Sequence, residues 1–66
     1  MNISFNGEPK HVPDRYTLSQ LLDSEDLTES RIAVEINGEI VPRSEHGSYR
    51  LHTGDRIEVV HAVGGG

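Results

Sequence analysis

MNISFNGEPKHVPDRYTLSQLL, residues 1–22, joins the pattern of a β-hairpin to the start of a helix. Ile3 and Phe5 alternate with polar residues, which is the period of a strand with one buried face. Asn6-Gly7 then favours a two-residue hairpin turn, because both residues tolerate positive φ. Pro9 lies in the predicted return strand and has no N–H to donate, so that strand is expected at a sheet edge.

The helix pattern begins with a capping box. In this motif the Thr17 side chain caps the first turn and the Gln20 side chain reaches back to the Thr17 backbone. Three leucines follow at the spacing of one helical face, and we expect the helix to end near Glu25. Those leucines are Leu18, Leu21 and Leu22.

Beyond the helix the chain returns to strand patterns. Residues 32–37 alternate, Asn37-Gly38 repeats the hairpin signal, and Pro42 ends the next short strand. We expect another short strand around residues 49–51, and a last, strongly apolar strand over residues 57–63.

This order of elements predicts an α+β fold. One amphipathic helix can cover one face of a sheet, and the first and last strands are the most apolar, so we place them side by side at its centre. The arrangement is a ubiquitin-like β-grasp, a mixed sheet of four to five strands packed on one short helix. Residues 1–63 form the predicted domain and residues 64–66 a flexible tail.

The composition narrows the function classes. The 66 residues include 11 acidic and 6 basic side chains and no cysteine, with a formal net charge of −5. Acidic charge disfavours binding to nucleic acid and to anionic membranes and favours basic protein partners. We see no signal-peptide pattern and expect a cytoplasmic protein that is monomeric alone. Because so short a chain has little room for a pocket as well as a core, a self-contained enzyme is disfavoured.

The tail is the most informative feature. It consists of Gly64, Gly65 and Gly66, which span roughly 10 Å when fully extended. Because glycine has no side chain, such a tail can enter a channel too narrow for any other residue. The expected terminal carboxylate of Gly66 is a poor acyl donor until it is activated, for example as an acyl-adenylate. The sequence has neither a G-x-x-x-x-G-K-[ST] nor a G-x-G-x-x-G motif, so activation is assigned to a partner enzyme.

Three stretches resemble the ThiS family of sulfur carrier proteins of thiamine biosynthesis. They are ISFNG at residues 3–7, INGEIVPR at 36–43 and TGDRIEVVHAVGGG at 53–66. The total length is also similar, so the resemblance covers essentially the whole chain. The Gly-Gly ending by itself is shared by all ubiquitin-like carriers.

The resemblance implies a cycle with three partners. A ThiF-type adenylyltransferase, which supplies the ATP site and its metal ion, would adenylate Gly66. A cysteine desulfurase or another sulfur donor would then convert the adenylate to a thiocarboxylate, and a ThiG-type thiazole synthase would take the sulfur for the thiazole ring. Gly64 and Gly65 would thread into the partners' active sites. The chain itself would be a carrier that binds no cofactor.

Strand parity predicts a docking surface at the base of the tail. If Ile57 and Val59 face the helix, then Glu58, Val60 and Ala62 face outward. Partner docking is therefore assigned to Val60, Ala62 and Glu58, and also to Arg43 in the family-like segment. Two alternatives involve no docking role: an exposed valine is common on protein surfaces, and Arg43 can be a solvated surface charge.

Four histidines lack the spacing of a metal site, and we expect no metal to bind. They are His11, His46, His52 and His61, of which His61 is expected to be partly covered. Three other functions remain open for a β-grasp chain with this tail. They are a molybdopterin-type sulfur carrier, a ubiquitin-like modifier and a noncovalent interaction module.

Overall fold

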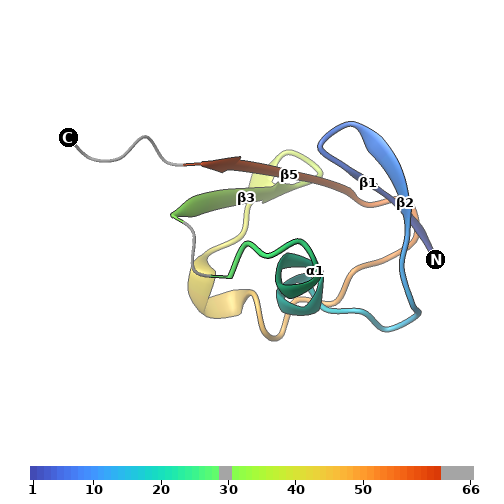
Figure 1. Cartoon of the computed structure of the whole chain (residues 1–66), viewed down its shortest axis with the longest axis horizontal. Coiled ribbons are helices and arrows are strands. Elements are labelled where there is room, and N and C mark those ends of the chain that lie inside the picture. Colours follow the sequence, from blue (N-terminus) through green and yellow to red (C-terminus); the bar gives the residue numbers. More distant parts are fainter. Residues whose placement is uncertain (29–30, 62–66) are drawn as a thin grey trace.

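The computed structural model describes residues 1–28 and 31–61. They form one five-stranded sheet, one α-helix and one 3-10 turn (Figure 1). The elements are β1 (Asn2–Phe5), β2 (Glu8–His11), α1 (Leu18–Ser24), β3 (Ile32–Ile36), β4 (Glu39–Ile40), η1 (Arg43–Glu45) and β5 (Arg56–His61).

The sheet is mixed and has the order β2-β1-β5-β3-β4. β1 runs parallel to β5, and the other neighbouring strands are antiparallel. The prediction that the first and last strands lie side by side is confirmed, as is the edge position of the strand that carries Pro9. Figure 1 shows α1 on one side of the sheet, with β5 leading toward the C-terminal end.

Both predicted hairpin turns are present. Asn6 and Gly7 have φ of 50° and 84°, and Asn37 and Gly38 have φ of 53° and 86°. Two successive positive φ angles match the right-handed twist of the strands they join, which is why the Asn-Gly pairs fix where each hairpin turns.

The helix begins with the predicted capping box. The Gln20 N–H donates to Thr17 Oγ1 at 3.1 Å, and the Thr17 N–H donates to Gln20 Oε1 at 2.9 Å. The three predicted leucines are buried, and the helix ends at Ser24 with Glu25 as its C-cap. A short helix is marginal alone, so this leucine face holds it against the sheet.

The core lies between α1 and the sheet. Its buried members are the leucines of α1 together with residues from three strands and three loops. They are Ile3, Val12, Leu18, Leu21, Leu22, Val34, Ile36, Val41, Leu51, Ile57 and Val59. No helix within the described ranges has the length or apolar character needed to cross a membrane.

The prediction of a strand around residues 49–51 is wrong. This segment makes a single bridge, between Arg50 and Thr17. The Leu18 N–H donates to the Tyr49 carbonyl and the Leu51 N–H donates to the Tyr16 carbonyl. The segment therefore pairs with residues that enter the helix, and no ladder can continue once α1 has begun.

Candidate functional site

β5 supports the predicted tail, and its side chains alternate as expected. Ile57 and Val59 are buried, whereas Glu58 and Val60 are exposed. Val60 is 59% exposed, which is unusual for a large apolar side chain in this molecule. The prediction that Glu58 and Val60 face away from the helix is confirmed.

The predicted acyl site lies beyond the described chain. Ala62, Gly64, Gly65 and Gly66 fall outside the described residues, as does the predicted end of the last strand at residue 63. The described part of the site is therefore the strand from which these residues continue.

The outer face of the sheet carries two residues that sequence reasoning missed. Val60 lies opposite Ala33, and Glu58 lies opposite Glu35, in the β3–β5 ladder. Ile40 in β4 lies opposite Glu35 and is 62% exposed. Cross-strand neighbours share a face, so Glu35 and Ile40 lie on the same outer face as Val60, Glu35 beside Glu58 and Ile40 further away in the edge strand β4. The alternation of residues 32–36 could have placed Glu35 on the outer face. The position of Ile40 on that face follows only from the register between β3 and β4.

Asp55 fixes the start of β5. It is 8% exposed, and its Oδ1 accepts from Asn37 Nδ2 at 3.0 Å while its Oδ2 accepts from the His52 N–H at 2.8 Å. The Asp55 carbonyl also accepts from the Ser4 N–H at 2.9 Å. One buried residue thus ties the turn before β5 to β1 and to the β3–β4 hairpin.

The turn asparagines also hold β5 through their side chains. Asn6 Oδ1 accepts from the Val59 N–H at 2.8 Å, and Asn37 Oδ1 accepts from the Arg56 N–H at 2.9 Å. The sequence indicated both residues only as turn formers. Their contacts with β5 depend on the sheet order, and together they make the strand below the tail a fixed support.

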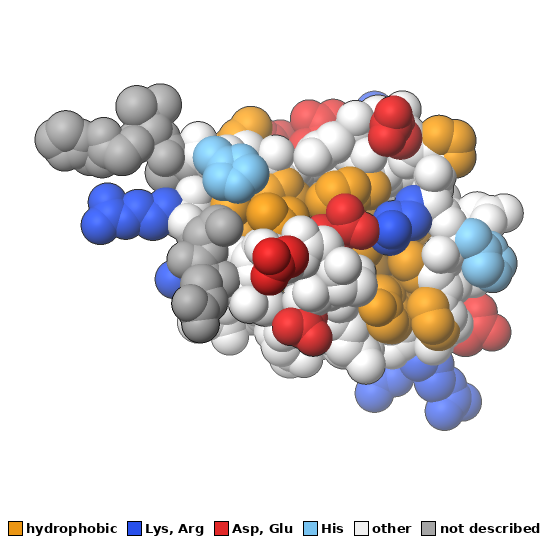
Figure 2. All heavy atoms as spheres, in the orientation of Figure 1, with side chains coloured by type: hydrophobic (Ala, Val, Ile, Leu, Met, Phe, Trp, Pro, Cys, Tyr) orange, Lys and Arg blue, Asp and Glu red, His pale blue; other side chains and the backbone are white. Residues whose placement is uncertain are grey.

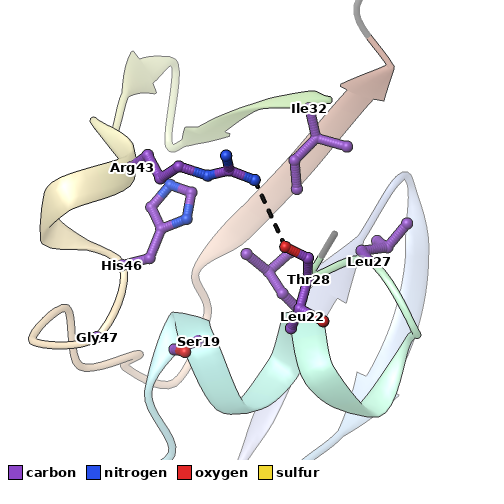
Figure 3. Close-up of a pocket in the computed structure, with 8 residues that line it drawn as sticks. All are labelled: Ser19, Leu22, Leu27, Thr28, Ile32, Arg43, His46 and Gly47. Atoms are coloured by element: carbon purple, nitrogen blue, oxygen red, sulfur yellow. Dashed lines mark hydrogen bonds between the residues drawn. The ribbon is translucent and has the colours of Figure 1, made fainter. Parts of the chain in front are cut away.

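Arg43 lies on the helix side of the sheet, away from Val60 and Glu58. It borders a cavity of about 200 Å³ between α1 and η1, where its Nη2 donates to the Thr28 carbonyl at 3.4 Å. Figure 3 shows Arg43 extending from η1 across this cavity, with His46 beside it and Ile32 on the far wall. The structure does not bring Arg43 together with the other proposed docking residues, and its docking role stays a prediction.

The histidines are scattered. His11 Nδ1 lies 2.8 Å from Asn2 Oδ1, and His46 Nε2 lies 3.1 Å from the Val41 carbonyl. His61 is exposed, not partly covered as expected, because among the described strands only β3 lies beside it. Within the described ranges, no group of three His, Asp or Glu side chains is placed to hold a metal ion.

Acidic and basic side chains are unevenly distributed over the face of the molecule drawn in Figure 2. In Figure 2, acidic side chains lie over the middle of this face and also at its top and right, while several basic side chains project at the left and the lower right. Burial, and then the charges of Asp55 and Glu39, raise the pKa of Tyr49 above its usual value. A tyrosine is protonated near pH 7 even at its usual pKa, so Tyr49 is not a candidate base.

A five-stranded mixed sheet that holds one short helix and ends in a supported central strand defines a β-grasp protein. Residues 3–66 match the ThiS family, and the chain belongs to that family. The crystal structure of the thiamine biosynthesis protein ThiS from Geobacter metallireducens is similar over the whole of both chains, with a TM-score of 0.87 and 29% identity.

Two kinds of relative are similar in sequence. The sulfur carrier protein ThiS of Bacillus subtilis is 37% identical over 65 residues, which cover 97% of this chain and 98% of that protein. The thiazole synthase of Magnetococcus marinus is 41% identical over 66 residues, all of this chain. The chain spans about a fifth of that protein's length and of a second thiazole synthase, from Paramagnetospirillum magneticum.

Proposed function

We propose that the chain is a sulfur carrier of thiamine biosynthesis and that its cargo is carried on the carboxyl group of Gly66. The observation that carries the proposal is the family match, which runs over residues 3–66 and includes the three glycines. The similarity to the sulfur carrier of Bacillus subtilis over nearly the full length of both proteins supports it.

The proposed chemistry has three steps. A partner adenylyltransferase, with its own ATP and metal ion, lets a Gly66 carboxylate oxygen attack the α-phosphorus of ATP and releases pyrophosphate. The terminal sulfur of a persulfide, formed on a cysteine desulfurase or another donor, then attacks the acyl carbon, and AMP leaves. A thiol reduces the S–S bond of the resulting acyl disulfide, becomes oxidised to a disulfide, and releases the acyl sulfur. The product is a thiocarboxylate, in which one carboxylate oxygen of Gly66 has been replaced by a nucleophilic sulfur.

The chain's own contribution is to position the Gly66 acyl group in the partner's active site. Gly64 and Gly65 have no side chains, so they can thread the acyl group into a partner's active site. The fixed support of β5 directs the tail, and Val60, Ala62 and Glu58 at its base are the proposed docking contacts, with Arg43 as a more remote one. Such positioning converts a bimolecular reaction into an effectively unimolecular one once the partner has docked.

Thiazole synthase is the proposed acceptor of the sulfur. In two relatives named thiazole synthase, a stretch that is 35–41% identical to this whole chain occupies about a fifth of the polypeptide. Joining two modules in one chain raises their effective concentration, which is useful when they act on each other.

Intact-mass measurement tests the proposal. The 66-residue chain is incubated with ATP, cysteine, a desulfurase and the adenylyltransferase, and we expect one oxygen to be replaced by sulfur at Gly66. A chain that lacks Gly66 serves as the control and is expected to stay unchanged. Sulfur on both chains, on neither, or at another residue would refute the proposal. Conjugation of Gly66 to lysine side chains would instead indicate a protein modifier.

A further inference from the structure

The last described residues of β5 have a neighbouring strand on only one side. β1 pairs with β5 through Ser4 opposite Arg56 and Phe5 opposite Ile57, and then turns back at Asn6-Gly7. β3 continues further, as far as Ile32 opposite His61. Figure 1 shows the β1–β2 hairpin at the end of β5 that lies away from the tail. Beyond this hairpin, no strand of the described part of the chain pairs with this edge of β5, which we call the open edge.

The backbone contacts show which groups point to that open edge. Ile57 and Val59 both bond to Asn6, through the Asn6 N–H to the Ile57 carbonyl at 2.8 Å and the Val59 N–H to Asn6 Oδ1 at 2.8 Å. Arg56 bonds to Asn37 on the opposite side. Successive residues alternate, so the Val59 carbonyl and the His61 N–H also point away from β3. Neither has a hydrogen-bond partner among residues 1–28 and 31–61.

These two groups flank Val60, the exposed apolar residue of β5. A partner segment that lies alongside β5 at this edge contacts the Val60 side chain and also removes water from the Val59 carbonyl and the His61 N–H. Buried backbone groups are nearly always hydrogen-bonded, because an unpaired one is costly. The partner must therefore supply one donor and one acceptor at strand spacing, and an extended strand has both.

We propose that a strand of thiazole synthase adds to the open edge of β5 and bonds to the Val59 carbonyl and the His61 N–H. This rests on the proposed function, in which thiazole synthase receives the tail. The partner residue opposite Val60 is apolar, since its side chain lies on the same face of the extended sheet. The partner strand also carries a lysine or arginine nearby, because Glu58 and Glu35 lie opposite each other there and no basic side chain among the described residues forms an ion pair with either.

A proline substitution tests the backbone contact. His61→Pro removes the N–H on the open edge and places a ring carbon there, whereas the ladder with β3 does not use that N–H. We expect the affinity for thiazole synthase, measured by calorimetry, to fall about tenfold or more. His61→Ala keeps the N–H and is expected to bind like the unchanged chain. Equal affinities for the proline and alanine variants would overturn the proposal.

Amide hydrogen exchange on the unchanged chain avoids any effect of proline on folding. The Val60 amide faces Ala33 in β3 and should exchange slowly in the free chain and in the complex alike. The His61 amide should exchange fast in the free chain and slowly once thiazole synthase is bound. A fast His61 amide in the complex, or slowing only by the adenylyltransferase, would overturn the assignment. Failure of the proposed function would appear separately, as absence of sulfur at Gly66 in the intact mass.

Discussion

Val60 differs from the other valine and isoleucine side chains of β5 because it faces solvent. We predict that Val60→Asp lowers kcat/KM for adenylation of Gly66 about tenfold or more. Covering a valine side chain contributes roughly 1.5 kcal/mol to docking, and a new carboxylate in the contact opposes it. Pyrophosphate release at limiting chain concentration measures the effect, and circular dichroism checks that the fold is kept.

Ile40→Asp is the matched control for Val60→Asp. Ile40 is equally exposed and lies on the same face of the sheet, but in β4 at the edge, away from the tail. We expect its substitution to leave adenylation nearly unchanged. A similar loss for both variants would contradict docking at the base of the tail and indicate contact with the whole sheet face.

At the residue scale, alternation predicts which side chains of β5 are buried, because a strand inverts its side chains at every step. The contacts of Asn6 and Asn37 with β5 could not be predicted in this way. Each joins residues far apart in the chain, and their partners follow only from the sheet order. Ile40 was missed for the same reason, since a two-residue strand has no period of its own.

At the scale of the element, Asp55 holds the beginning of β5. We predict that Asp55→Ala lowers the free energy of unfolding by about 1–3 kcal/mol, because the His52 N–H and the Asn37 amide lose their acceptor in a buried site. Urea denaturation measures the change. Asp23→Ala, on the exposed side of α1, should change the free energy by no more than about 0.5 kcal/mol. Equal losses for the two variants would show that the buried network is not what fixes β5.

Several elements of the fold were predictable from short sequence motifs. The Asn-Gly turns, the capping box and the leucine face each have a mechanism that acts within a few residues, so they could be predicted. The segment at residues 49–51 has strand-like composition, yet its neighbour is the start of α1, and only the tertiary fold reveals that. The sequence likewise could not indicate that β1 stops short of the end of β5.

At the scale of the whole molecule, a small core supports one strand, and that strand leads to the glycines. The sheet order was predictable because the first and last strands are the most apolar, and the family was predictable from the three stretches that resemble ThiS. The predicted position of the tail stays a prediction, because Gly64, Gly65 and Gly66 lie outside the described residues.

The transfer of labelled sulfur tests the central claim most directly. The chain is loaded with isotopically labelled sulfur at Gly66, purified, and given to thiazole synthase and its other substrates without any free sulfur source. We predict labelled thiazole, with one labelled sulfur atom for each chain that returns to the carboxylate form. Unlabelled thiazole, or thiazole formed with a chain that lacks Gly66, would contradict the account.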